Sequence, residues 1–247
     1  MSHLLGAGVF LVLAFFLLRR GAGNVARLVS LALFSIGAVS LLSISGVYHL
    51  LHPMGAPREV LRVLDHAAIF VLIACSFTPP HVILFRGPWR WGMLAVVWSF
   101  AAVAITLKSV FFGAIPEIVG TGLYLGMGWI GLVSGIVLWR RFGYAFIAPI
   151  LWGGVAYSLG AVLDVLRWPV VFPGVVQWHE IFHVAVLIGL TFHWVFIFGI
   201  ADGRLSPGSP SAALEGCSNP VWREGVRCGS LAISWFQFME VVMSYPR

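Results

Sequence analysis

The sequence predicts an all-α integral membrane protein, a bundle of seven transmembrane helices with a polar C-terminal tail. Of its 247 residues, 60% are hydrophobic and only 10% are charged, whereas a soluble domain carries about 25% charged residues. The mean hydropathy is +0.97, and the apolar residues fall in runs long enough to cross a bilayer. We expect these runs to be helical, because lipid offers no hydrogen-bond partner to an open strand edge.

Seven apolar runs make up the predicted membrane domain. They are expected at residues 4–18, 29–51, 60–84, 90–111, 117–138, 144–167 and 178–200. The charges Arg19 and Arg20 follow the first run, so it is better explained as a short span than as a signal peptide, in which the charges come first. Proline and glycine in 53–57, 86–88 and 169–174 separate neighbouring spans.

Two residue patterns agree with helices packed inside a membrane. Tryptophans near span ends are typical interfacial anchors, and they occur at Trp89, Trp91, Trp139, Trp168 and Trp178. Glycines inside the fifth and sixth spans predict close helix packing, and they are Gly120, Gly122, Gly126, Gly128, Gly131, Gly153, Gly154 and Gly160.

Residues 203–247 form the predicted tail, which follows the membrane domain of residues 1–202. The tail begins with serine, proline and glycine, which predict a flexible exit from the last span. The apolar run 231–243 is short for a span and contains Gln237 and Glu240. An interfacial or disordered segment is therefore favoured over an eighth span.

The 15 Lys and Arg residues are unevenly divided between the two sides of the membrane. Eleven lie in the tail and in the connections after the first, third and fifth spans, and four lie in the other connections. The positive-inside rule then predicts a cell (plasma) membrane protein with its N-terminus outside and its C-terminus in the cytoplasm. Since these residues lie in short loops, they are better explained as topology determinants than as a nucleic-acid-binding surface.

Ionisable residues inside a span are costly, so each is a candidate functional group. His179 and His183 are four residues apart, which puts both on one helical face, where they can bind one cation. Ser45 and His49 have the same spacing at the end of the second span, and Asp65 lies near the start of the third. The second span ends on the side where the third and seventh begin. The sequence therefore predicts a metal site near one membrane face.

The remaining polar residues carry less weight. Glu180 completes an H-E-x-x-H pattern but lies about 100° round the helix from the preceding histidine, so an orienting or loop-facing role is favoured over that of a catalytic base. His66 is either a neighbour of Asp65 in the site or a polar residue of a helix start, and His52 is expected at the interface. His81 falls on the opposite face, and His193 lies roughly 15 Å along the axis from the histidine pair.

Several stretches together resemble a known family. They are SHLLGAG at 2–8, SGVYHLL at 45–51, LDHAAIFVLIACSFTP at 64–79, LYLGMGWIG at 123–131, GGVAYSLGAV at 153–162 and HEIFHVAVLIG at 179–189. The sequence resembles the hemolysin III group of the adiponectin and progestin receptor superfamily, which is related to alkaline ceramidases. The resemblance covers most of residues 2–200. Asp164 departs from it, because an aromatic residue is usual at that place.

The resemblance implies one zinc ion (Zn²⁺) held by His49, His179 and His183, with Asp65 and Ser45 beside the bound water. The residues agree with this, since three neutral imidazoles leave a fourth position open, as catalytic zinc sites require. Zinc polarises a carbonyl and activates water, Asp65 is the expected general base, and Ser45 can donate a hydrogen bond to it or to the water.

Four functions are compatible with these residues in different degrees. The favoured function is zinc-dependent hydrolysis of an amide or ester bond in a lipid that enters from the bilayer. The alternatives are a receptor or pore-forming cytolysin with a structural metal, an intramembrane zinc protease built on the H-E-x-x-H pattern, and a bis-histidine haem protein. The protease has no use for His49 with Asp65, and a carboxylate beside the histidines argues against haem.

Overall fold

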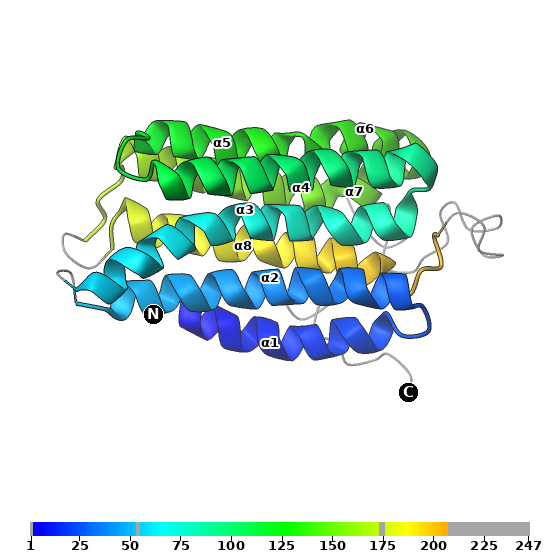
Figure 1. Cartoon of the computed structure of the whole chain (residues 1–247). Helices are drawn as coiled ribbons and strands as arrows, with labels where there is room; N and C mark the ends of the chain where they lie inside the picture. Colours follow the sequence, from blue (N-terminus) through cyan, green and yellow to red (C-terminus); the bar gives the residue numbers. More distant parts are fainter. Residues whose placement is uncertain (1, 53–54, 173–175, 207–247) are drawn as a thin grey trace.

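The computed structural model describes residues 2–52, 55–172 and 176–206, which contain eight α-helices. These are α1 (Ser2–Arg20), α2 (Val25–Leu50), α3 (Ala56–Leu84), α4 (Gly87–Val110), α5 (Glu117–Trp129), α6 (Gly131–Phe142), α7 (Tyr144–Leu166) and α8 (Trp178–Ile200). Helices α5 and α6 lie end to end (Figure 1), so the described residues contain seven segments that are long and apolar enough to cross a membrane. Apart from one isolated bridge between Phe172 and Val176, the described residues form no β-structure. The predicted seven-helix bundle is confirmed.

The predicted spans agree with the helices to within two residues at their C-terminal ends, except in the fifth. Helices α1 to α4 begin two to four residues earlier than predicted. In α2 the earlier start has a polar N-cap, Asn24, whose side chain accepts a hydrogen bond of 2.9 Å from the Arg27 N–H. The fifth span was expected to be one helix ending at residue 138. It continues to Phe142 and is interrupted at Ile130, whose N–H faces the carbonyls of Gly126 and Gly128.

The glycine pattern predicts close packing correctly at some positions. A methyl group at Gly160 in α7 would lie 2.5 Å from Cβ of Ala185 in α8, so these helices can approach closely only with glycine there. Gly153 has the same role against the ring of His193. The prediction is wrong for four glycines beside which the described residues leave open space, namely Gly122, Gly126, Gly128 and Gly154.

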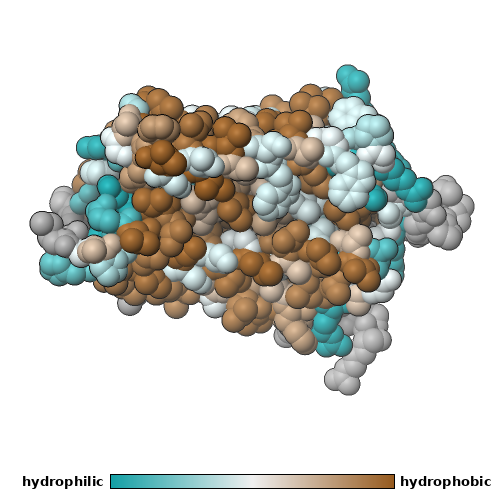
Figure 2. Space-filling view, viewed as in Figure 1, coloured by the Kyte–Doolittle hydropathy of each residue, from teal (hydrophilic) through white to brown (hydrophobic). Residues whose placement is uncertain are grey.

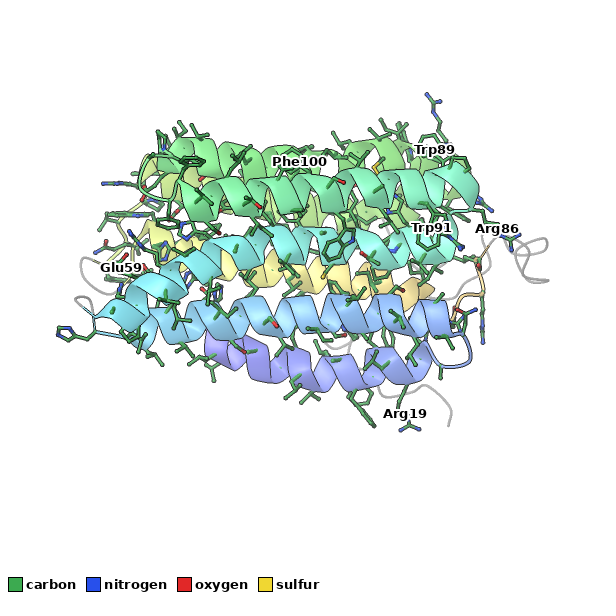
Figure 3. All side chains as sticks on the ribbon, in the orientation of Figure 1. Arg19, Glu59, Arg86, Trp89, Trp91 and Phe100 are labelled. Atoms are coloured by element: carbon green, nitrogen blue, oxygen red, sulfur yellow. The ribbon has the colours of Figure 1, made fainter. Side chains whose placement is uncertain are left out.

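Polar residues lie at the two ends of the bundle, and apolar side chains cover its middle (Figure 2). Arg19, Arg86, Trp89 and Trp91 lie at one end, and Glu59 lies at the other (Figure 3). This distribution is that of a multi-pass membrane protein with interfacial tryptophans. The predicted tail begins at residues 203–206, which follow α8, while its remainder, including the apolar run 231–243, lies outside the described residues.

An ion pair joins the first and the last helix of the membrane domain at one end of the bundle. Arg20 at the end of α1 donates to Asp202 just after α8, with 3.0 Å between Nη2 and Oδ2. Between these elements lies the larger apolar core, which α1, α2, α3, α7 and α8 share and which includes the fully buried Phe34 and Trp194. Helix α8 begins at the opposite end of the bundle, which is the end at which the polar residues of the spans meet.

Candidate metal centre

Three histidines converge at the end of the bundle where α2 and α7 finish and α1, α3 and α8 begin. His49 is the last residue but one of α2, His179 is the second residue of α8, and His183 lies one turn further along α8. One ligand nitrogen from each lies within 4.8 Å of the others. The predicted convergence of these three residues is confirmed, although 130 residues separate His49 from His179.

The spacing of the imidazoles suits a first-row metal ion. Nε2 of His49 lies 3.1 Å from Nε2 of His179. Two nitrogens bound to one tetrahedral zinc at about 2.0–2.1 Å would lie roughly 3.3 Å apart. His183 completes the set, with its ring centroid 4.5 Å from that of His179 and 4.8 Å from that of His49. The three rings therefore form a group that could hold a metal ion through one nitrogen each.

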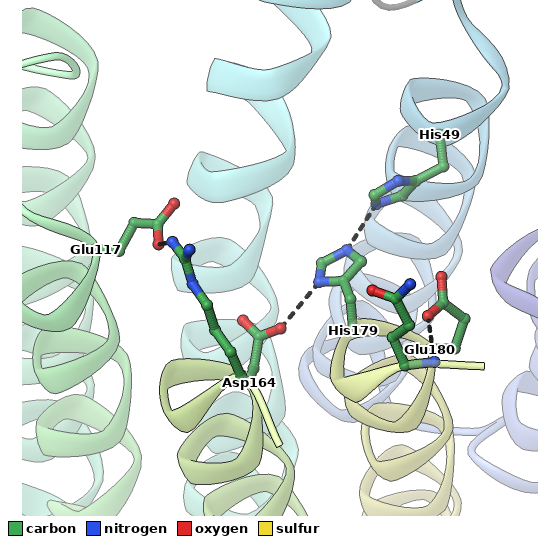
Figure 4. A network of polar contacts seen from close by, with 7 residues as sticks. His49, Glu117, Asp164, His179 and Glu180 are labelled. Carbon is green, nitrogen blue, oxygen red and sulfur yellow. Dashed lines mark hydrogen bonds and ion pairs between the residues drawn. The ribbon is translucent and has the colours of Figure 1, made fainter. Parts of the chain in front are cut away.

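Asp164 orients one of the three rings. Its Oδ1 lies 3.0 Å from Nδ1 of His179 on the side opposite the contact with His49 (Figure 4). An Nδ1–H that donates to this carboxylate leaves the lone pair of Nε2 free for a metal. The resemblance to the family gave no reason to expect this residue. Its position three residues before Arg167, at the end of a span that finishes on the site side, is the signal that could have found it.

His3 is a second residue that the sequence did not assign to the site. Its ring stacks on that of His183 at 3.9 Å between centroids. Nδ1 of His3 lies 2.9 Å from the Ser45 hydroxyl, and Nε2 lies 3.3 Å from the His183 carbonyl. A neutral imidazole has one N–H, so it donates to one of these oxygens at a time. Since the first span begins on the same face as the third and seventh, its position could have been predicted.

Asp65 and Ser45 lie beside the histidines as neighbours, outside the group of ligands. Ser45 is buried, with its hydroxyl 2.9 Å from Nδ1 of His3 and close enough to the Asp65 carboxyl group to affect its charge. Asp65 lines the same cavity as His49 and His179. The arrangement brings a carboxylate to the cavity wall near the candidate metal ligands.

The other polar candidates have different roles. Glu180 caps α8, because its Oε2 accepts a hydrogen bond of 3.0 Å from the Gln177 N–H (Figure 4). His66 bonds the Arg62 carbonyl of its own helix and packs against Phe112. The remaining three histidines were predicted to stand apart from the metal ligands, and they do: His52 is exposed beyond α2, His81 bonds Ser134 and His193 bonds the Gly189 carbonyl.

A cavity of about 1090 Å³ extends from the histidine cluster through the bundle. At one end it is lined by Asp65 and His179, and at the other by His81 and His193. The fifteen residues from His66 to His81 along α3 correspond to roughly 22 Å at 1.5 Å per residue. The cavity is therefore large enough for a long apolar ligand whose polar part lies at the histidines.

Known proteins share this sequence over most of the membrane domain. Residues 1–194 match the family model described as haemolysin-III related. The chain is 34% identical to Hemolysin-3 of Bacillus cereus over 132 residues, which cover 52% of this chain and 59% of that protein. It is 34% identical to the heptahelical transmembrane protein ADIPOR2 of Oryza sativa subsp. japonica over 187 residues, 69% of this chain and 81% of that protein.

A second bacterial protein gives a similar match. The Hemolysin-3 homolog of Bacillus subtilis (strain 168) is 31% identical over 136 residues, which cover 54% of this chain and 63% of that protein. The chain thus spans less than two thirds of the length of these two bacterial relatives, and more of the plant protein.

Proposed function

Since the chain belongs to the haemolysin-III related family, as its motifs predicted, we propose that it is a zinc-dependent hydrolase of an amide or ester bond in a membrane lipid. The observation that carries the proposal is a cluster of three convergent imidazoles, two of which, those of His49 and His179, line one lipid-sized cavity together with the carboxylate of Asp65. Such a cavity can hold acyl chains, while the polar groups act on the bond where the chain joins the headgroup.

Each polar residue has a defined task in this reaction. Zinc held by His49, His179 and His183 would supply a Lewis acid for the carbonyl group and activate water. Asp65 takes a proton from the attacking water and passes it to the leaving nitrogen or oxygen, so that the products are a carboxylic acid and an amine or alcohol. Ser45 holds Asp65 in place. When its proton is on Nδ1, His3 donates to Ser45 and leaves the serine proton free for Asp65.

The alternatives rest on fewer observations. An intramembrane protease of the H-E-x-x-H type needs Glu180 as its base, and this carboxylate is exposed and caps α8. The name of the Bacillus cereus relative points to cytolysis by that protein. A receptor or cytolysin with a structural metal would keep the same three ligands but would need no general base in the cavity.

Metal analysis combined with a lipid assay tests the proposal. We expect about one zinc ion per purified chain and turnover of a lipid amide that stops on chelation and returns when zinc is added. A haem chromophore, or no metal in protein purified from native membranes, would overturn the zinc site. Full zinc loading without turnover of any lipid amide or ester would leave the receptor or cytolysin.

We further propose the cell membrane as the location, with the N-terminus outside and the site on the outer side. The basis is the excess of Lys and Arg in the connections on the opposite side. A reporter that is active only in the cytoplasm, fused after Ala201, should be active, and the same reporter inserted at Gly55 should be silent. The reverse pattern would place the metal centre at the cytoplasmic face.

Asp164 should strengthen metal binding without touching the metal. Removing a carboxylate that orients a ligand histidine typically lowers metal affinity about 10–100-fold. We expect Asp164→Ala to show a loss in this range and Asp164→Asn a smaller one, measured by competition with a chromophoric chelator. Glu117→Gln is the matched control, because this carboxylate lines the same cavity but pairs with Arg167. Equal zinc affinity in all four proteins would show that Asp164 does not act on His179.

A further inference from the structure

Lys108 is a cation in the wall of the cavity that the proposed reaction does not use. It lies in the last turn of α4, and only 4% of its surface is exposed. Its ammonium lies 5.2 Å from the centroid of the Phe112 ring and makes no hydrogen bond or ion pair with the described residues. A buried charge is costly unless it is paired or faces a polar ligand, so the contact with Phe112 alone does not account for it.

The carboxylates of the cavity already have other partners. Asp164 pairs with His179, and Glu117 pairs with Arg167 at 3.6 Å, while Asp65 lies near Ser45 and His179. Glu117 is within electrostatic reach of Lys108, but its side chain is 84% exposed. An exposed carboxylate shared with an arginine offers little stabilisation. Lys108 is thus a cavity cation whose counter-charge the described residues do not supply.

A second cation lies near the same aromatic ring. The guanidinium carbon of Arg62 is 4.7 Å from the Phe112 centroid, and Arg62 also lines the cavity. Its ion pair with Glu59 is half-exposed, so it remains available to a ligand. Two cations at one ring suit a group with two negative charges, and a phosphate monoester carries about −1.5 to −2 at pH 7.

Gly120 makes room for the ammonium group. A methyl group at this position in α5 would lie 3.0 Å from Nζ of Lys108. Lys108 is two residues before the end of α4, at the same end of the bundle as His49. It therefore lies at the depth of a lipid headgroup, while the cavity beyond it is deep enough for acyl chains.

We propose that Lys108, with Arg62 beside it, binds the phosphate headgroup of the lipid whose amide or ester bond is placed at the three histidines. This inference rests on the proposed function, because it names the substrate class of that reaction as a phosphate-bearing lipid. Lysine is a common phosphate ligand in proteins, where its ammonium acts as a point charge.

Binding of two ether-linked lipids tests the headgroup site without requiring turnover. They have the same alkyl chains and end in a phosphate or in a hydroxyl group, and the zinc-loaded protein is held in an uncharged detergent. We expect the phosphate lipid to bind roughly tenfold more tightly, as a charge-assisted hydrogen bond allows. Lys108→Met should abolish this preference, and Lys108→Arg should retain most of it.

Two further variants complete the experiment. Arg141→Met is the control, because Arg141 lies 5.0 Å from the Phe142 ring at the other end of the bundle and is not part of the cavity lining; the preference should persist. Gly120→Ala displaces the ammonium without removing the charge and should weaken the preference. Zinc content reports whether each variant is folded. If Lys108→Met loses zinc, the lipid preference of Gly120→Ala decides whether the ammonium binds the phosphate.

Three results would overturn the headgroup site. The first is equal affinity of the wild-type protein for both lipids, and the second is a preference for the phosphate lipid that survives in zinc-loaded Lys108→Met. The third is displacement of the phosphate lipid by inorganic phosphate at equal concentration, which would indicate a site for the free ion. Failure of the reaction is distinguishable from these. A Lys108-dependent preference without turnover of any lipid would keep the headgroup site and refute the hydrolase.

Discussion

Replacing His183 by alanine is expected to empty the metal centre, so that zinc falls from about one ion per chain to nearly none. His183 is buried between His3 and the other two ligands. Two imidazoles alone bind zinc far more weakly than three, and no other ligand nitrogen within the described residues belongs to the cluster. Elemental analysis of the purified variant measures the effect.

A matched histidine on the same helix controls for general damage. His193→Ala removes another imidazole from α8, ten residues further along, where the ring bonds the Gly189 carbonyl. The variant loses the packing contact between His193 and Gly153, so it can be less stable. It should nevertheless keep its zinc. If His183→Ala kept its zinc as well, the three-histidine site would be refuted.

Asp65→Asn is expected to keep the zinc and to lower turnover by about 10²–10⁴-fold, the range that a general base contributes. The amide has nearly the same shape and can still accept a hydrogen bond from Ser45, so folding and metal loading should survive. It cannot take a proton from water. Zinc content and lipid-amide turnover are measured on the same preparation, so that a loss of metal is not mistaken for a loss of base.

The comparison with Glu180→Gln separates the competing roles. If Asp65 were a metal ligand, Asp65→Asn would lose zinc together with activity. If Glu180 were the base, its glutamine variant would be inactive and Asp65→Asn would turn over normally. We expect Glu180→Gln to affect mainly the start of α8, where the carboxylate caps the Gln177 N–H. Retained turnover in Asp65→Asn is the result that refutes the assigned base.

The spans could be predicted because hydropathy and length alone decide which segments cross a bilayer. The interruption at Ile130 could not, since the glycines around it are compatible both with a continuous helix and with a break. The same ambiguity explains why the prediction of close packing was right at some glycines and wrong at others. A glycine indicates that a neighbour can come close, but whether one does depends on the arrangement of other helices, as the contrast between Gly160 and Gly126 illustrates.

The convergence of the three histidines was predictable for a similar reason, since counting spans determines the membrane face on which each histidine lies. Span counting fixes depth but not rotation about the helix axis. Asp164 and His3 therefore had known depths, yet nothing in the sequence indicated that they point towards His179 and Ser45. Those contacts depend on how α7 and α1 turn against α8 and α2, which the packing of the whole bundle decides.

The separation of His49 from His179 in the chain has a consequence for the order of synthesis. The 130 residues between them take a ribosome roughly 6–26 seconds to add, at about 5–20 residues per second. Until α8 has entered the bilayer, a nascent chain holds one of the three imidazoles, and Ser45 and Asp65 are already in the membrane. We therefore expect a metal ion to bind only after the last span is complete, because a chain interrupted before Trp178 lacks two of the three histidines.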